Sequence, residues 1–109
     1  VLVAVADASA EAADSLALAA GAEVATVDAI LADAAIDAIL ICTPTDTHAD
    51  LIEAAVAAGK AVFCEKPVDL DAARIRACLA TVDRSGKPLM IGFNRRFDPN
   101  FAALEARLR

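Results

Sequence analysis

The residues with the clearest chemical potential are Glu65 and Lys66, which stand between the apolar run Ala61–Cys64 and Pro67. A short apolar run of this kind predicts a buried strand, so the acid and the base must lie where that strand ends. In open α/β sheets, ligands bind at this carboxyl edge. A lysine held there and partly shielded from water can hydrogen-bond a substrate hydroxyl or carbonyl and act in proton transfer. The residue types alone fit equally well with an exposed pair that merely follows a strand.

The run Ala38–Cys42 predicts a second buried strand, and it too ends in polar residues. It is followed by Thr43-Pro44-Thr45-Asp46-Thr47-His48. Hydroxyl and backbone N–H groups at a strand-to-helix turn suit the phosphates or ribose of a dinucleotide. Capping of the next helix by Asp46 or Thr47 would explain the same residues. Taken alone, His48 is expected to be a surface residue on the first helical turn.

Asp7 closes the apolar stretch Val1–Ala6, which predicts another strand. In that position a carboxylate would accept hydrogen bonds from adenosine ribose hydroxyls and repel a 2′-phosphate. An aspartate that only forms a turn would give the same pattern, and both interpretations stay open.

The segment Asn94-Arg95-Arg96-Phe97-Asp98 follows the last predicted strand, Leu89–Phe93. For Asn94 and Arg95 we favour contact with a nicotinamide ring or with substrate hydroxyls. For Arg96 we favour an ion pair with Asp98 that shapes the exit from the sheet.

Alternating strand and helix patterns must hold these groups in place. Strands are predicted at Val1–Ala6, Glu23–Thr26, Ala38–Cys42, Ala61–Cys64 and Leu89–Phe93, and helices at Ala10–Ala20, Ala29–Asp33, about 46–58, about 71–84 and from Pro99 onward. Ser9 and Asp28 are the expected caps of the first two helices, and Leu16 is expected on an inner face. This order gives βαβ units, and hence a parallel sheet with right-handed crossovers and helices on both faces.

Composition limits the classes of function. The 109 residues carry a net charge of −6 and no basic stripe, which argues against a nucleic-acid partner. No stretch approaches the roughly twenty apolar residues of a membrane span, so no membrane partner is expected. Three cysteines and a single histidine favour free thiols in a reducing, cytoplasmic setting over disulfides or a metal site. Because the chain opens without methionine inside a predicted strand, we expect part of a longer protein.

Three motifs in order resemble the Gfo/Idh/MocA family of NAD(P)-dependent oxidoreductases. They are Ile41-Cys42-Thr43-Pro44-Thr45-Asp46-Thr47-His48, Ala57-Ala58-Gly59-Lys60 and Glu65-Lys66-Pro67. The later segment Gly92–Pro99 looks most like the inositol 2-dehydrogenase branch. The resemblance covers essentially the whole chain.

This resemblance implies a partial NAD(P)-binding Rossmann domain at residues 1–93. Residues 94–109 would then lead into a C-terminal α/β substrate domain whose open sheet forms a dimer or tetramer. It also implies hydride transfer between a nicotinamide cofactor and a cyclic polyol or sugar, best matched by oxidation of a ring hydroxyl of myo-inositol to a ketone.

The resemblance also assigns roles to single residues. Lys66 matches the lysine that contacts the substrate hydroxyl beside the nicotinamide and assists proton transfer. Asp7 matches the ribose-binding acid and favours NAD over NADP. Asn94 and Arg95 fall at the junction of the nicotinamide and substrate pockets. The residues that match the cofactor-side wall are Glu65, Thr43, Pro44, Thr45 and His48.

The sequence departs from the family pattern at both ends. No G-x-G-x-x-G occurs, and that loop with its preceding strand would lie before Val1. Because this strand is central in the usual order, its absence predicts that the sheet splits. The Asp and His that partner the lysine would lie after Arg109, so we expect these residues alone to be inactive. His48, on the cofactor side, is not assigned that partner role.

Two other functions remain open. The chain could belong to a dehydrogenase of another sugar in the same family, or to a non-catalytic dinucleotide-binding or sensing module. Lys66 argues against a purely structural scaffold, which needs no lysine at that edge.

Overall fold

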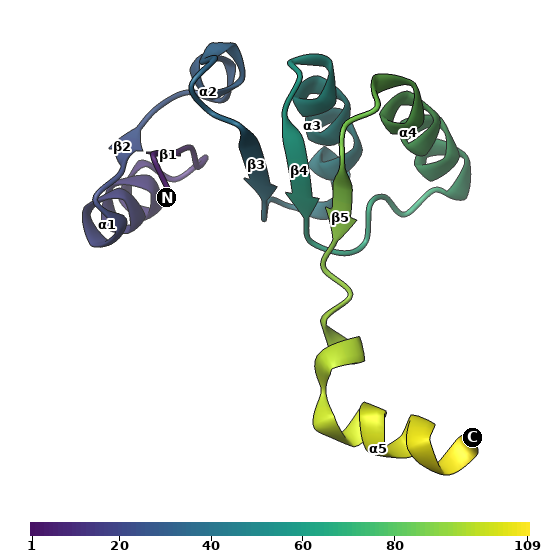
Figure 1. Ribbon diagram of the computed structural model, residues 1–109. Coiled ribbons are helices and arrows are strands. Elements are labelled where there is room, and N and C mark those ends of the chain that lie inside the picture. Colours follow the sequence, from purple (N-terminus) through teal and green to yellow (C-terminus); the bar gives the residue numbers. More distant parts are fainter.

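The computed structural model describes residues 1–109 as alternating strands and helices (Figure 1). The strands are β1 (Ala4–Val5), β2 (Glu23–Val24), β3 (Ala38–Ile41), β4 (Ala61–Cys64) and β5 (Leu89–Ile91); the helices are α1 (Ala10–Ala20), α2 (Val27–Ala32), α3 (Thr45–Ala57), α4 (Ala72–Ser85) and α5 (Pro99–Leu108), with a 3-10 turn, η1 (Asn94–Phe97). The predicted order of elements is confirmed. Only η1 was not predicted.

The strands form two separate parallel sheets, as the sequence predicted. One sheet holds β1 and β2, and the other has the order β3-β4-β5. In Figure 1 the first sheet stands apart from the second, and the arrows of β3, β4 and β5 point the same way. The carboxyl ends of these three strands therefore meet at one edge.

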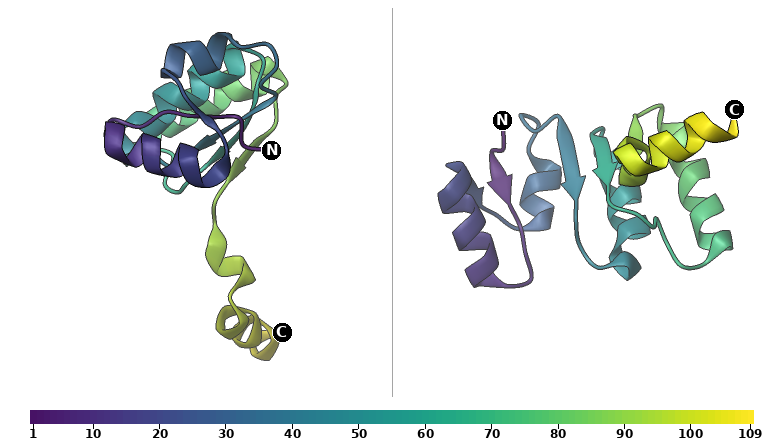
Figure 2. Two further views of the ribbon diagram at one scale, coloured as in Figure 1. Left: turned by 90° about the vertical axis from the view of Figure 1, so that its left-hand side faces the viewer. Right: turned by 90° about the horizontal axis from the view of Figure 1, so that it is seen from below.

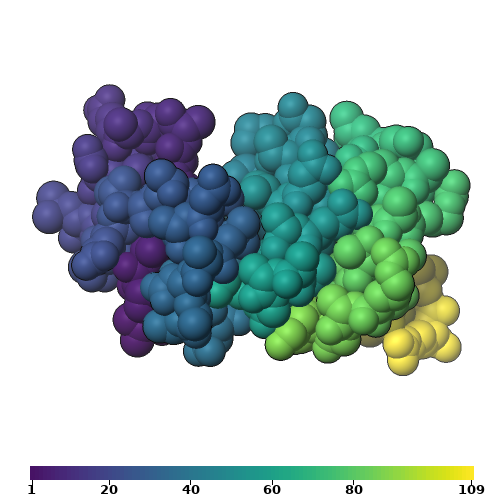
Figure 3. All heavy atoms as spheres, turned by 90° about the horizontal axis from the view of Figure 1, so that it is seen from above, coloured from purple at the N-terminus to yellow at the C-terminus, as the bar shows by residue number.

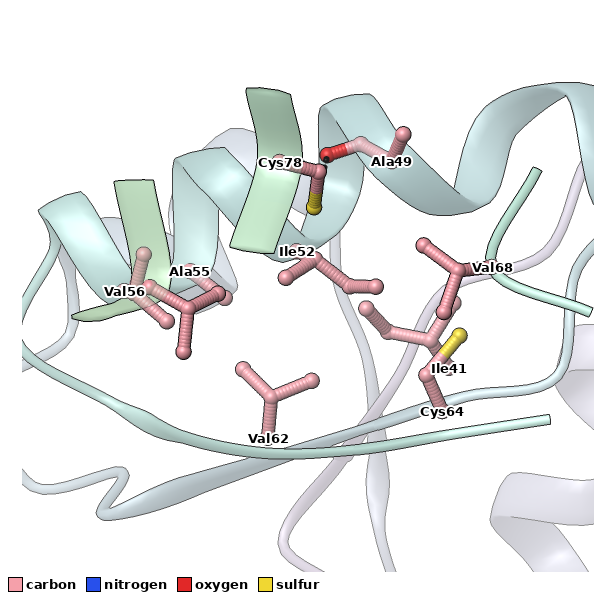
Figure 4. Packing of buried hydrophobic residues seen from close by; sticks show 10 residues of the cluster. Ile41, Ala49, Ile52, Ala55, Val56, Val62, Cys64, Val68 and Cys78 are labelled. Atoms are coloured by element: carbon pink, nitrogen blue, oxygen red, sulfur yellow. Dashed lines mark hydrogen bonds between the residues drawn. The ribbon is translucent and has the colours of Figure 1, made fainter. Parts of the chain in front are cut away.

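The main core lies between the β3-β4-β5 sheet and helices α3 and α4. One face of the sheet presents Ile41, Val62 and Cys64 towards Ile52, Ala55 and Val56 of α3 (Figure 4). Cys78 of α4 enters the same cluster and its thiol donates a long hydrogen bond, 3.8 Å, to the Ala49 carbonyl. The side chains at the centre are buried because the alternation of the strand residues matches the apolar stripe of α3.

The opposite face of this sheet is open. Leu40, Phe63 and Met90 are paired in register across β3, β4 and β5, and Leu40 and Met90 are more than half exposed. The parallel α/β fold is confirmed, but in this chain α3 and α4 cover only one face of the larger sheet. β3 is an edge strand in the order β3-β4-β5, and its open face leaves Leu40 exposed, so it is not the fully buried strand that its apolar sequence predicted.

The smaller unit is β1–α1–β2. Ser9 caps α1 by accepting a hydrogen bond from the Ala12 N–H, and α1 ends at Gly21 in the left-handed region, as predicted. Ala13 and Ala17 are the buried residues of α1, whereas Leu16 is 52% exposed. The inward placement of Leu16 was wrong because a sheet of two short strands covers only the narrow alanine face.

Helix α2 begins earlier than predicted. Its cap is Thr26, whose hydroxyl accepts a hydrogen bond of 3.1 Å from the Ala29 N–H. Asp28 lies inside the first turn instead of capping it.

Helices α3 and α4 are tied together by one arginine. Arg74 donates two hydrogen bonds of 2.8 Å to the carboxylate of Glu53 and one of 2.6 Å to Asp50. This arrangement holds the pKa of Glu53 below its usual value, chiefly through the hydrogen bonds from Arg74. Asp71 caps α4 by accepting from the Ala73 N–H.

Helix α5 extends away from both sheets (Figure 2). Its stripe, Phe101, Leu104 and Leu108, is between 45% and 79% exposed. The radius of gyration is 16.0 Å, against roughly 13 Å for a compact chain of about this length. Seen from above, α5 is mostly hidden and shows only at one margin of the molecule (Figure 3). No helix is both long enough and apolar enough to cross a membrane.

Candidate functional site

The segments that follow β3, β4 and β5 lie side by side at one edge of the larger sheet. The Glu65 N–H donates to the Ile41 carbonyl and the Gly92 N–H donates to the Cys64 carbonyl, both at 2.9 Å. These bonds extend the pattern of strand hydrogen bonds by one residue beyond β4 and β5. Thr43, Lys66 and Asn94 all lie on segments that leave the sheet from this common edge, as the sequence predicted.

Glu65 and Lys66 differ in their surroundings. Glu65 is half-buried and its carboxylate accepts a 3.3 Å hydrogen bond from the Lys66 N–H, whereas the Lys66 side chain is exposed. The Lys66–Pro67 peptide is cis. The Lys66 ammonium makes no hydrogen bond or ion pair within this chain, so it is free to meet a ligand.

The close approach of Gly92 to Glu65 explains why a glycine follows β5. A Cβ atom at position 92 would lie 3.3 Å from the Glu65 carboxylate and 3.2 Å from the Phe63 ring. Gly92 is buried, and the absence of its side chain leaves room for the acid. Gly92 was not among the predicted site residues, although a glycine near a strand end often marks such a close approach.

The turn between β3 and α3 is closed by its own hydroxyl groups. The Thr47 hydroxyl donates to the Pro44 carbonyl at 2.8 Å and lies 2.6 Å from the Thr43 hydroxyl. Because Thr47 gives its proton to the carbonyl, Thr43 is the donor between the two hydroxyls. Helix α3 begins at Thr45 and no side chain caps it. The predicted capping by Asp46 or Thr47 was therefore wrong, and the first N–H groups of α3 keep no side-chain partner.

His48 is buried, with only 1% of its surface exposed, so its expected surface position was wrong. Its Nε2 lies 2.7 Å from the Thr43 carbonyl and its Nδ1 lies 2.7 Å from the Pro67 carbonyl. Both ring nitrogens face main-chain oxygens, so in this arrangement neither is available for direct contact with a ligand. The residue spacing carries no signal for this contact, because Pro67 is distant in sequence.

Asp7 follows β1 and belongs to the smaller sheet. Its Oδ1 accepts a 2.8 Å hydrogen bond from the Ser9 N–H just before α1, and the residue is exposed. This is the turn that the sequence left open as an alternative. The second carboxylate oxygen has no protein partner, so it remains available to accept a hydrogen bond from a ligand.

The segment after β5 forms η1, and its arginines stack on phenylalanine rings. The guanidinium of Arg95 lies 5.4 Å from the ring centroid of Phe101, and that of Arg96 lies 5.3 Å from Phe97. Asp98 caps α5 by accepting a 2.7 Å hydrogen bond from the Asn100 N–H. The predicted ion pair between Arg96 and Asp98 was wrong. The Asp98 carboxylate caps α5, and the Arg96 guanidinium stacks on the neighbouring Phe97 ring. Asn94 and Arg95 are exposed beside the edge.

Two surface hollows lie away from this edge. One, of about 500 Å³, is lined by residues of the N-terminal segment and α2, and the other, of about 380 Å³, includes Lys60 and Lys87 near the amino ends of the strands. No group of three or more His, Cys, Asp or Glu residues could hold a metal ion. The candidate site is the edge of polar groups at the carboxyl ends of β3, β4 and β5.

Comparison with known proteins agrees with this geometry. The sequence profile of the GFO_IDH_MocA family, described as an oxidoreductase family with an NAD-binding Rossmann fold, matches residues 1–93. An inositol 2-dehydrogenase of Rhizobium meliloti is 65% identical over 94% of this chain and 31% of its own length. A scyllo-inositol 2-dehydrogenase (NAD(+)) of Bacillus subtilis is 42% identical over 72% of this chain and 23% of its own length.

Solved structures give the same result. A crystal structure from Sinorhizobium meliloti superposes with a TM-score of 0.91 at 62% identity, covering 99% of this chain and 33% of that chain. The scyllo-inositol dehydrogenase of Lactobacillus casei, solved with NAD(H) and scyllo-inositol, superposes with a TM-score of 0.88 at 31% identity over 98% of this chain and 32% of that chain. This chain spans about a third of such structures or less. With its profile match, its parallel α/β architecture and its Glu65-Lys66-Pro67 edge, it belongs to the Gfo/Idh/MocA family of oxidoreductases with an NAD-binding Rossmann fold.

Proposed function

We propose that this chain is the nucleotide-binding part of a longer NAD-dependent dehydrogenase that oxidises a ring hydroxyl of inositol to a ketone. The observation that carries the proposal is the exposed Lys66, which follows the middle strand β4 at the edge where the segments after β3 and β5 also leave the sheet. A scaffold or a sensor does not require a free lysine at that place. The inositol dehydrogenases among the relatives supply the substrate class.

The groups at the edge fit a dinucleotide. The uncapped N–H groups of α3 and the turn Thr43–Thr45 suit its phosphate or ribose oxygens, because a helix start carries partial positive charge. The free carboxylate oxygen of Asp7 suits the ribose hydroxyls and would repel the 2′-phosphate of NADP. Glu65, Asn94 and Arg95 would border the nicotinamide end. The bound nicotinamide supplies the hydride acceptor.

Lys66 is the residue that we assign to the chemistry. Oxidation of the hydroxyl to a ketone removes a hydride from carbon and a proton from oxygen. The Lys66 ammonium would donate a hydrogen bond to that oxygen, hold the carbon towards the nicotinamide and take part in moving the proton. Its acid/base partners would come from the substrate domain, to which residues 94–109 lead. We therefore expect the 109 residues alone to be inactive.

The relatives leave the stereochemistry of the substrate to be decided by assay. They include dehydrogenases named for inositol, for myo-inositol and for scyllo-inositol. These isomers differ in the orientation of one ring hydroxyl, so the substrate domain and not this edge would distinguish them. Assembly into a dimer or tetramer, also proposed, would be measured by light scattering of the full-length protein.

The test is an assay of the full-length protein that contains this chain. We expect NADH to form with myo-inositol or scyllo-inositol, and we expect Lys66→Ala to lower kcat by about a hundredfold or more. Lys87→Ala removes another exposed lysine, at the amino end of β5, and should leave kcat unchanged. NAD binding without turnover of any polyol or sugar would refute the proposal and favour a sensing module. Turnover of another sugar would confirm the reaction and correct the substrate.

The cofactor preference has its own test. Replacing the Asp7 carboxylate by Asp7→Ser should weaken NAD binding and improve the relative use of NADP. An unchanged ratio of kcat/KM for the two cofactors would mean that Asp7 serves only its turn.

A further inference from the structure

His48 joins the two loops that the proposed site needs. Its ring lies in the first turn of α3 and contacts the Thr43 carbonyl in the turn before it. The other nitrogen contacts the carbonyl of Pro67, the residue that follows Lys66. No other side chain of this chain makes a hydrogen bond that connects the Thr43 turn to the loop after β4.

The main chain of Lys66 is held on both sides. Before it, the Glu65 N–H donates to the Ile41 carbonyl of β3 at 2.9 Å. After it, the Pro67 carbonyl is held by His48, and Val68 is buried in the main core. The lysine backbone is thus fixed while its ammonium stays exposed, which is the arrangement expected for a residue that must reach a ligand from a defined position.

The His48 ring has the chemistry for this connection. A carbonyl oxygen can only accept, so a ring N–H must be the donor in these contacts, and the tautomer decides which nitrogen carries the proton. Because the ring is only 1% exposed, water cannot easily replace it as a partner. Removing the ring would therefore leave the Thr43 and Pro67 carbonyls without their side-chain partner.

We propose that His48 is a positioning residue of the dehydrogenase: it fixes the Lys66 loop against the β3–α3 turn, so that the lysine and the cofactor-binding turn keep one relative placement. This inference rests on the proposed function for its kinetic consequence. It removes His48 from the direct cofactor contacts and from proton transfer, and gives it a role through Lys66.

The kinetic test uses His48→Leu in the full-length enzyme, with His48→Gln as the milder variant whose amide can still donate to a carbonyl. We expect His48→Leu to lower kcat at saturating substrate by about tenfold or more, because small displacements of a reacting group are costly. His48→Gln should fall between it and the unaltered enzyme. Ile52→Val, which thins the same core at a fully buried residue of α3, is the control and should keep kcat within about twofold.

A double variant separates positioning from a general loss of structure. If His48 acts through Lys66, adding His48→Leu to Lys66→Ala should slow the enzyme no further. Losses that simply multiply, or a kcat for His48→Leu within twofold of the unaltered enzyme, would overturn the proposal.

Hydrogen exchange gives a readout that does not need activity. In His48→Leu, the amides of residues 65, 66, 68 and 69 should exchange faster than in Ile52→Val, while those of β5 stay protected. Unchanged exchange at these amides would overturn the proposed link even if the protein oxidised no polyol. If the unaltered full-length protein is inactive but exchange changes as expected, the proposed function fails and the link stands.

Discussion

The carboxylate of Glu65 lies 3.3 Å from the place where a Cβ atom on Gly92 would stand. This contact predicts that Gly92→Ala displaces the acid from the edge. The methyl group has two neighbours to push, Glu65 and the ring of Phe63, and both side chains have some freedom to shift. We expect a loss in unfolding free energy of about 1 kcal/mol and a drop in kcat/KM of about tenfold in the full-length enzyme.

The double variant Gly92→Ala with Glu65→Ala checks the cause. Once the carboxylate is gone, the added methyl should have little further effect on kcat/KM. A full additional loss in the double variant would locate the damage at Phe63 instead.

Replacing the buried Lys60 should lower the stability of the fold without acting on the candidate site. Its side chain is 3% exposed, and its ammonium donates to the carbonyls of Asp33 at 2.6 Å and Ile36 at 2.8 Å. Lys60→Met keeps the apolar stem but removes both donors. We expect a loss of about 2 kcal/mol or more in unfolding free energy, measured by urea unfolding followed by circular dichroism. Lys87→Met, at an exposed lysine, is the matched control and should change little.

The pair of Glu53 and Arg74 predicts a pH dependence of stability. Hydrogen bonds from Arg74 hold the pKa of Glu53 below its ordinary value of 4.5. A lowered pKa in the folded state means that the stabilisation is present above pH 4.5 and is lost as the pH falls through the folded value. Because the carboxylate is partly exposed, the effect should be small. Thermal midpoints of Glu53→Gln should lie below those of the unaltered chain at neutral pH and converge with them in acid. Equal midpoints at neutral pH would contradict the prediction.

The three cysteines should react very differently with a thiol reagent. Burial raises the pKa of Cys64 to about 11 and also raises the pKa of Cys78, and both thiols are 0% exposed. Cys42 is exposed. Alkylation of the folded chain at neutral pH should therefore add a single label, at Cys42, and the unfolded chain should take up three. Intact mass and peptide mapping would show this, and rapid labelling of Cys64 in the folded chain would contradict it.

Local patterns in the sequence were enough to predict the order and type of the regular elements. Ser9 and Gly21 at the ends of α1, and Asp98 before Pro99 at the start of α5, are signals that act through neighbouring residues. The strand β4 was predicted to the residue, since its four apolar residues are bounded by Lys60 and Glu65.

Features set by contacts between distant residues could not be read in this way. The burial of His48 depends on the Pro67 carbonyl, and the exposure of Leu40 depends on what covers its face of the sheet. The ion pair predicted for Arg96 failed because a ring next to it competes for the guanidinium. The placement of Thr43, Lys66 and Asn94 at one edge was predictable, because parallel strands deliver their carboxyl ends together.

The division of the strands into two sheets bears on the cooperativity of folding. The β1–α1–β2 unit has a cluster of only three buried residues, whereas the larger unit has ten. The two sheets share no strand pairing and their apolar clusters differ in size. We therefore expect the two units to unfold in separate transitions. Calorimetry of this chain should show a van't Hoff enthalpy smaller than the calorimetric enthalpy, with the small unit melting first. A strand paired with both β1 and β3 would join the two sheets, and the two units would then unfold in one transition.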